Sequence, residues 1–175
     1  MDIYGVNYQV IRCENLLDAS AIYNVHTQAF ERENEAQLVK NIRHSDRYIP
    51  QLSLVAEVDN TVVGHILFSY VDLIGEETLR VLSLAPLAVV PQFQRQGIGS
   101  ALVQVGLETA DTMGEALVIV LGHSQFYPRF GFQPSVNYGI ESPFSVPEDV
   151  FMVKLLTNYQ GFKGKVIYPP AFQEV

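Results

Sequence analysis

The sequence contains only one cysteine, Cys13, among its 175 residues. A single thiol cannot form an internal disulfide, which excludes a disulfide-stabilised secreted scaffold and fits a reducing compartment. No apolar run approaches the ~18 residues that a membrane-spanning helix requires. The N-terminal stretch MDIYGVNYQVIRCEN lacks the basic segment and apolar block of a signal peptide. We therefore predict a cytoplasmic protein that is not inserted in a membrane.

Positive charge is also scarce. Eleven Lys and Arg residues face nineteen Asp and Glu residues, so the formal net charge is −8 at pH 7. This balance disfavours nucleic-acid backbones and anionic lipid surfaces as partners, and it suits a cationic substrate. Apolar residues are not scarce, because they make up 48% of the chain, which is enough for a substantial core. From the length we predict that residues 1–175 form a single domain.

The spacing of apolar residues predicts a mixed α/β domain with one central sheet. The first helix should begin after an N-cap at Asp18, and a longer one should run from Gly97 to a C-terminal glycine, Gly114. The apolar face of this longer helix is predicted to comprise Ile98, Ala101, Leu102, Val105, Thr109 and Thr112 or Met113. A second short helix is expected around Leu38, Val39 and Ile42, after an interruption at 30–34, and another at 124–130. Strands are expected at 52–57, 61–72, 79–90, 116–121, 151–156 and 165–168.

The junction QRQGIGS, residues 94–100, stands between a predicted strand and the longer helix. The first N–H groups of a helix lack internal partners and attract anions, and a glycine there lets a ligand approach the backbone closely. Gly97 and Gly99 could therefore admit a phosphate, with charge from Arg95 and a hydroxyl from Ser100. The pattern is neither a Walker loop nor a complete dinucleotide fingerprint. A tight turn that binds no ligand is the alternative.

The segments on both sides of this junction carry a family resemblance. The stretch LAVVP, residues 87–91, followed by QRQGIG, resembles the acetyl-CoA signature of the GCN5-related N-acetyltransferases (GNAT). About 30 residues further on, FYPRFGF at 126–132 resembles the tyrosine segment of the same family. The predicted order of elements is similar to the family fold across roughly residues 7–157. The sequence of these segments looks most like the bacterial YhbS-like branch of the family.

The resemblance implies a GNAT-type acyl-CoA N-acyltransferase fold, in which the sheet is splayed between two parallel strands. It implies that pantetheine lies between strands 84–90 and 117–121, with Pro86 at a bulge that opens the splay and with no metal involved. A backbone N–H near Leu87 or Ala88 would polarise the thioester. The residues it assigns to acetyl-CoA are Leu87, Ala88, Val89, Gln94, Arg95, Gln96, Gly97, Ile98, Gly99 and Ser100.

Tyr127 takes the catalytic position of the family's tyrosine segment. A tyrosine of ordinary pKa, near 10, is a weaker acid than a thiol, near 8.5, so complete proton transfer to a thiolate is uphill by about 2 kcal/mol. A hydrogen bond to the developing thiolate is the more modest role. By the same resemblance, Arg129 and Phe130 hold the tyrosine loop, and Gly131 permits the turn that follows.

The group that removes the proton of the amine is left open. Strand 84–90 carries no acid, whereas the family often has a glutamate there. The candidates are Glu33, Glu35, His65 and His123, or a chain of water molecules. Each of these side chains could instead be a solvated charge or a packed histidine.

The predicted activity is transfer of an acetyl group from acetyl-CoA to a small-molecule or peptide amine, with a cationic acceptor favoured and a homodimer possible. Segments 30–43, 71–77 and 133–149 are expected to line the acceptor pocket. An acyl-CoA sensor of the same fold, without turnover, is the first rival. A nucleotide-binding protein unrelated to CoA is the second, although no P-loop lysine supports it.

Overall fold

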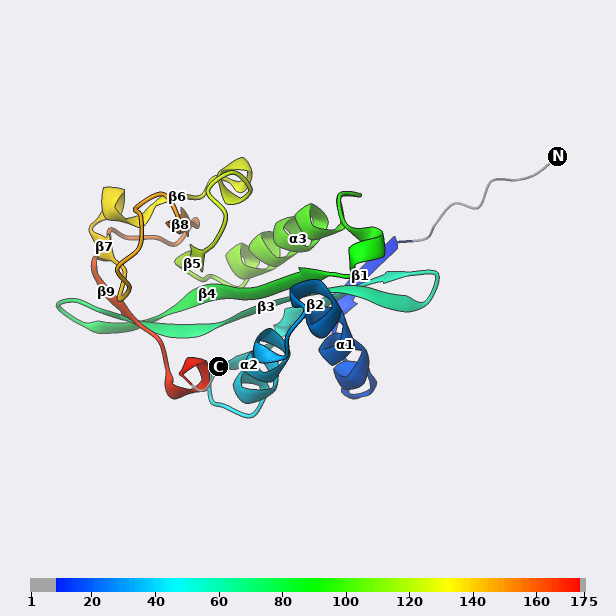
Figure 1. The fold of residues 1–175 in the computed structure, drawn as a ribbon. Helices are drawn as coiled ribbons and strands as arrows, with labels where there is room; N and C mark the ends of the chain where they lie inside the picture. Colours follow the sequence, from blue (N-terminus) through cyan, green and yellow to red (C-terminus); the bar gives the residue numbers. More distant parts are fainter. Residues whose placement is uncertain (1–8, 174–175) are drawn as a thin grey trace.

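The computed structural model describes residues 9–173 and contains one sheet that joins all its strands (Figure 1). The strand order is β1-β2-β3-β4-β5-β8-β6, and β9 pairs with both β3 and β7. Residues 1–8, part of the stretch where the sequence argues against a signal peptide, lie outside this range, as do residues 174–175. Within residues 9–173, no helix is long and apolar enough to cross a membrane.

The predicted mixed α/β architecture is confirmed. The helices are α1 (Ala19–Phe30), α2 (Asn34–Arg43) and α3 (Ile98–Thr112). The long strands are β2 (Tyr48–Val58), β3 (Thr61–Ile74) and β4 (Thr78–Val89). The shorter strands are β1 (Gln9–Cys13), β5 (Leu117–Leu121), β6 (Gln133–Pro134), β7 (Ile140–Glu141), β8 (Phe151–Leu155) and β9 (Gly164–Ile167).

Three details differ from the prediction. Asp18 is the N-cap residue of α1, as predicted, but its carboxylate does not cap the helix, because it accepts hydrogen bonds from Arg12 and from the Asn15 N–H. The helix expected at 124–130 is only a single 3₁₀ turn, Tyr127–Phe130. Strand β1 was not predicted, because its sequence QVIRC does not alternate and it depends on the neighbouring β2 for its hydrogen bonds.

The buried face of α3 also differs from the predicted one. Met113 and Thr112 are exposed, and Val105 and Thr109 are only half-buried, whereas Val103, Gly106, Leu107 and Ala110 are buried together with Ile98 and Leu102. Gly106 explains why the buried face differs from the predicted one, because the helix packs here on Phe68 of β3, and a Cβ at residue 106 would lie 2.2 Å from that ring. A glycine has no hydropathic signal, so apolar spacing could not show that the strand packs against it.

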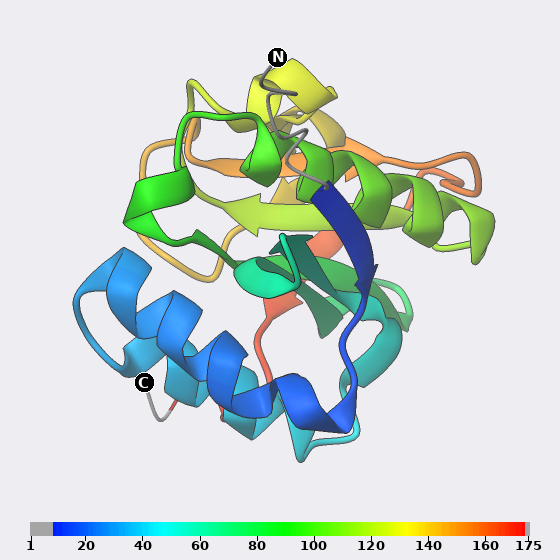
Figure 2. The ribbon, with the colours of Figure 1, turned by 90° about the vertical axis from the view of Figure 1, so that its right-hand side faces the viewer.

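The helices cover opposite faces of the sheet, with α1 and α2 on one face and α3 on the other (Figures 1 and 2). Side chains along β3 alternate between these layers, as a pleated strand requires. Ile66 and Phe68 belong to the core cluster that includes α3. Leu67 belongs to the cluster that contains Ile22 of α1 and Val39 of α2. His65 has the same parity as Leu67 and therefore faces α1 and α2.

Strands β4 and β5 run parallel but remain paired only briefly. Their register is Leu82 to Val118 and Ser83 to Ile119, and no pairing between them follows. The predicted splay is therefore present. Between β3 and β4 the register jumps from Phe68–Leu84 to Ile66–Leu87, so that β4 holds one extra residue in a bulge that includes Pro86. This confirms the bulge expected at Pro86.

Candidate active site

The N-terminus of α3 lies directly beyond the end of β4, after a 3₁₀ turn at Pro91–Phe93. Gly97 occupies its N-cap position with φ 84°, and no side chain of the described residues caps the helix. The first backbone bond runs from the Ala101 N–H to the Gly97 carbonyl, at 3.0 Å. The N–H groups of residues 98–100 have no acceptor among the described residues. The positive end of the helix dipole is thus open toward solvent.

The two glycines of this junction differ in what they require. Gly97 adopts a left-handed conformation, which by itself explains a glycine. Gly99 does not, and among the described residues a Cβ added there would meet only the Val89 Cγ2 atom, at an ordinary 3.9 Å. A helical glycine costs up to about 1 kcal/mol relative to alanine. Neither backbone geometry nor packing within the protein requires Gly99, which favours a ligand that approaches it closely.

A cavity of about 450 Å³ opens at this helix end. Five of the seven arginines in the chain form ion pairs, namely Arg12, Arg32, Arg43, Arg47 and Arg80. The other two, Arg95 and Arg129, have no carboxylate partner in the described part of the chain, and both line this cavity. Its full lining is Val89, Phe93, Gln94, Arg95, Gly97, Gly99, Ser100, Phe126 and Arg129. In an acidic protein, this placement creates a local site for an anion.

Not every residue assigned to acetyl-CoA presents its side chain to this cavity. The Gln94 side-chain amide donates to the Val89 carbonyl at 2.9 Å, which joins the end of β4 to the loop. Gln96 donates to the Gln92 carbonyl at 3.2 Å. Ile98 is buried in the core, so only its backbone faces the helix end. Leu87 and Ala88 lie on β4 beyond the point where β5 separates.

Tyr127 lies at the start of the 3₁₀ turn after β5, with its ring packed edge-on against Phe126 and Phe132. The ring fits because residue 122 is a glycine, where a Cβ would lie 2.4 Å from the tyrosine ring. Although Tyr127 is only 7% exposed, its hydroxyl forms no hydrogen bond to any described residue, and it is not among the fully buried unpaired oxygens. The hydroxyl therefore remains accessible to a ligand.

Burial raises the pKa of Tyr127 to about 12. The phenol is consequently protonated at neutral pH and acts as a hydrogen-bond donor. Against a thiol of pKa near 8.5, complete proton transfer would be uphill by about 5 kcal/mol. The structure therefore favours donation of a hydrogen bond over release of the proton.

A second cavity, of about 430 Å³, adjoins the first and shares Phe126 and Arg129 with it. The Arg129 guanidinium lies over the Phe126 ring, 4.7 Å from its centroid, and its Nε donates to the Phe126 carbonyl at 3.3 Å. These contacts hold the arginine between the two cavities. The second cavity is lined by Gly122, His123, Ser124, Gln125, Phe126, Arg129 and Val150.

The four candidate bases lie in different surroundings. Glu35 pairs with Arg32, and Glu33 lies exposed at the N-cap position of α2. His123 lines the second cavity. His65 is fully buried and contacts Ser53 and His26. His26 was missed as a candidate, although its position between Val25 and Ala29 in the apolar stripe of α1 predicts that it is buried.

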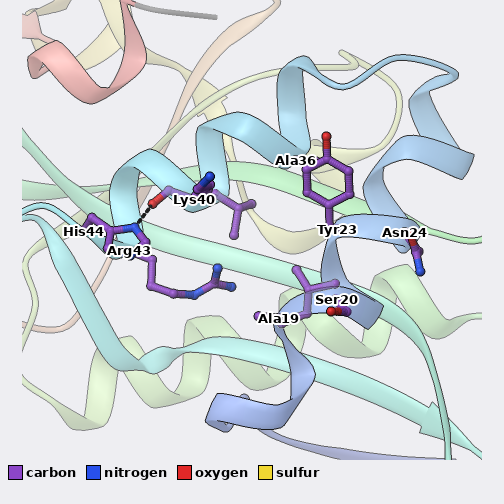
Figure 3. A pocket seen from close by; sticks show the side chains of 10 residues that line it. Ala19, Ser20, Tyr23, Asn24, Ala36, Lys40, Arg43 and His44 are labelled. Carbon is purple, nitrogen blue, oxygen red and sulfur yellow. Dashed lines mark hydrogen bonds between the residues drawn. The ribbon is translucent and has the colours of Figure 1, made fainter.

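A groove of about 440 Å³ between α1 and α2 is shown in Figure 3. Its lining includes Lys40, Arg43 and His44, with the His44 ring 2.8 Å from the Lys40 carbonyl oxygen. The Arg43 guanidinium is engaged by Glu14, and no residue of β4 lines the groove. Residues 75–77 line yet another cavity with residues 160–164, so the segments expected around the acceptor do not all meet. Among residues 9–173, no three His, Cys, Asp or Glu side chains could together hold a metal ion.

Comparisons with known proteins identify the family to which this fold belongs. The family model of the acetyltransferase (GNAT) domain matches residues 50–134. The uncharacterised N-acetyltransferase YjhQ of Escherichia coli is 41% identical over 134 residues, which cover 75% of this chain and 74% of YjhQ. The uncharacterised N-acetyltransferase YhbS of Escherichia coli is 35% identical over 166 residues, or 93% of this chain and 98% of YhbS.

Solved structures extend the likeness to the whole fold. The crystal structure of Escherichia coli YhbS in complex with CoA has a TM-score of 0.89 at 32% identity, and the match covers 99% of this chain and 96% of YhbS. A GNAT family acetyltransferase from Brucella melitensis in complex with acetyl-CoA has a TM-score of 0.78 at 31% identity, over 95% of this chain and 99% of that protein. The chain therefore belongs to the GNAT family of acetyltransferases.

Proposed function

We propose that this protein transfers the acetyl group of acetyl-CoA to a primary amine by direct attack in a ternary complex. The observation that carries the proposal is the coincidence at one cavity of an open helix N-terminus, a glycine that packing does not require, and the two arginines without carboxylate partners. All three features suit the pyrophosphate of a CoA thioester. The complexes of two relatives with CoA and acetyl-CoA support the same ligand.

In this proposal the backbone N–H groups of residues 98–100 bind the pyrophosphate, and Arg95 and Arg129 supply positive charge beside it. The pantetheine arm passes between β4 and β5, where the two strands separate after Ser83 and Ile119. Among the described residues, strand β4 has no partner on that side beyond this point, so its backbone groups there are available to the ligand. The Val89 carbonyl already accepts from Gln94 and keeps one lone pair.

The chemical step needs a polarised carbonyl and a stabilised leaving thiolate. A backbone N–H near Leu87 or Ala88 would donate to the thioester oxygen, and such a preorganised donor contributes about 10²–10³ in rate. Tyr127 would donate to the sulfur as negative charge develops on it. The bonds that form and break are the amide C–N bond and the thioester C–S bond. Net transfer moves one proton from the amine to the thiol.

A melting curve with and without acetyl-CoA tests the proposal, with ATP as the control ligand. At 100 times its dissociation constant, acetyl-CoA would add about 2.7 kcal/mol of stability. For a chain of this size, that corresponds to a rise in Tm of roughly 5–10 °C. A rise with acetyl-CoA and none with ATP is expected. The absence of a shift, together with no heat of binding in calorimetry, would refute the assignment.

An acyl-CoA sensor of the same fold is the second candidate function. The segment 84–89 of β4 carries no carboxylate to act as a base, which is the observation that favours it. Turnover of acetyl-CoA against a panel of polyamines, aminoglycosides, amino acids and peptides separates the two functions. The cationic nature of the acceptor, the homodimer and the cytoplasmic location stay predictions.

A further inference from the structure

A chain of buried hydrogen bonds crosses the sheet on the face that α1 and α2 cover. His26 Nε2 of α1 lies 2.8 Å from His65 Nδ1 of β3, and His65 Nε2 lies 2.8 Å from Ser53 Oγ of β2. Ser53 Oγ donates to Glu14 Oε1 at 2.7 Å. The two imidazoles and the serine are fully buried. This hydrogen-bond chain of four side chains therefore links α1 to the segment between β1 and α1.

Glu14 determines the direction of every bond in this chain. Its carboxylate accepts from Arg43, Tyr48 and Ser53, so the single hydroxyl proton of Ser53 points toward Glu14. Ser53 must then accept from His65, which places the His65 proton on Nε2 and leaves Nδ1 as an acceptor. His65 Nδ1 in turn accepts from the Nε2–H of His26. The remaining nitrogen, His26 Nδ1, is left with a free lone pair.

Both imidazoles are neutral at pH 7. Burial lowers the pKa of His26 to about 4, and burial lowers the pKa of His65 well below its ordinary value. The charged groups that act on His26 come from α2, where Glu35 raises its pKa and Arg43 lowers it. Segment 84–89 of β4 contributes no titratable group. His26 Nδ1 therefore carries no proton across the physiological pH range.

His26 Nδ1 has no hydrogen-bond partner in the described part of the protein, although the atom is completely buried. A buried acceptor without a donor costs free energy, so its retention calls for an explanation. Its place in the fold supplies one. Directly across from His65 on β4 is Ala88, where the thioester is proposed to lie, and α1 packs on β4 as well as on β3.

The two faces of the sheet suit the two substrates. The phosphate cavity lies at the N-terminus of α3, on one face, while His26 lies in α1 on the other. Between β4 and β5 the sheet is open beyond Ser83 and Ile119. An amine that approaches the thioester from the α1 face would therefore meet the side of the sheet that carries His26. Phe30, 37% exposed, stacks on the imidazole with its ring centroid 6.1 Å away.

We propose that His26 Nδ1 accepts the proton that the attacking amine releases, and that His65, Ser53 and Glu14 are positioning residues behind it. The inference rests on the proposed acetyl transfer. As the amine nitrogen bonds to the thioester carbon and the C–S bond breaks, that nitrogen becomes acidic. Its proton passes to Nδ1, directly or through one water molecule. It then returns through solvent to the CoA thiolate, so that amide and thiol are the products.

Nitrogen-15 NMR of the wild-type histidines tests the direction of the chain without any variant. At pH 7, His26 and His65 are expected to be neutral, with the proton on Nε2 in both rings. A proton on Nδ1 of His26, or a charged ring at pH 7, would overturn the proposal. This measurement does not depend on turnover, so it tests the hydrogen-bond chain independently of the proposed activity.

Kinetics with an acceptor found in the amine panel tests the role in catalysis. His26→Gln is expected to lower kcat by about 10²–10⁴-fold, the usual contribution of a general base, with the Kd for acetyl-CoA and the KM for the amine changed less than twofold. His44→Gln, which changes an exposed histidine at the end of α2, is the control and keeps wild-type kcat. Wild-type kcat in His26→Gln would refute the role.

The positioning residues are tested by a matched pair of serines. Ser53 and Ser69 are both fully buried, but Ser69 Oγ has no hydrogen-bond partner among the described residues. Ser53→Ala should lower kcat about tenfold or more and mix the tautomers of His65, whereas Ser69→Ala should do neither. Equal effects in both variants would show that these hydrogen bonds have only a structural role. Acetyl-CoA binding without turnover of any amine would instead refute the proposed acetyl transfer, and the NMR result on the tautomers would still hold.

Discussion

Replacement of Gly99 by alanine should stabilise the free protein and weaken its binding of acetyl-CoA. Gly99 lies in the first turn of α3 without a positive φ, and the added methyl carbon would be 3.9 Å from Val89 Cγ2. A glycine in a helix interior costs about 1 kcal/mol relative to alanine, and roughly half of that is expected in a first turn. The Tm of the free protein should therefore rise by about 1–2 °C.

Gly97→Ala is the matched comparison, because it alters the same junction with the opposite effect on the free protein. No atom of residues 9–173 lies within 4 Å of the added Cβ, but φ is 84° there. The left-handed conformation costs a non-glycine residue about 1–2 kcal/mol. The Tm of the free protein should therefore fall by about 2–8 °C. The pair separates the backbone requirement for glycine from the requirement of a bound ligand.

The assay is the shift in Tm at a fixed concentration of acetyl-CoA, set at 100 times the wild-type Kd. If the methyl group at residue 99 raises Kd tenfold, the ligand contributes about 1.4 kcal/mol in place of about 2.7 kcal/mol. The shift should then fall from roughly 5–10 °C to about half of that. An unchanged shift in Gly99→Ala, with its Tm raised, would show that nothing approaches this residue closely and would refute the reasoning.

Three further predictions concern single side chains. Tyr127→Phe should lower kcat by about 10- to 100-fold and leave the Kd for acetyl-CoA within twofold, since it removes only a hydrogen bond to the charged leaving group; wild-type kcat when chemistry limits the rate would contradict this. Arg129→Ala should raise that Kd about tenfold at low salt, whereas Arg80→Ala, which breaks an ion pair with Asp46 elsewhere, should not; equal Kd values would contradict the role of Arg129. The pKa of His26 is about 4 in the folded protein and near 6.5 in the unfolded chain. As pH falls below 6.5, the unfolded chain binds the proton first, so about 3 kcal/mol of folding stability that is present above pH 6.5 is lost by about pH 4. Chemical denaturation between pH 7 and pH 4 should show a smaller loss in His26→Gln than in the wild type.

The sequence could predict those elements whose signal is local. The helical spacing in α1 and α2, the wholly apolar β5 and the turn between β2 and β3 each depend on residues close together in the chain, and each was confirmed. Strand β1 could not be predicted, because its stability comes from hydrogen bonds to residues 54–58 of β2 rather than from its own pattern. The face of α3 was misassigned because Gly106, where a Cβ would lie 2.2 Å from the Phe68 ring, has no side chain to read.

The candidate site divides in the same way. The sequence by itself determined the helix start at Gly97, the tyrosine segment after β5 and the family, because each is a short contiguous motif. Only the tertiary structure decided that Arg95 and Arg129 share a cavity and that His26 meets His65, residues 39 positions apart. Those contacts depend on sheet register and on the packing of α1 across β3. The physical reason is that hydrogen bonds and cavities are set by distances in space, whereas periodicity reports only on neighbours along the chain.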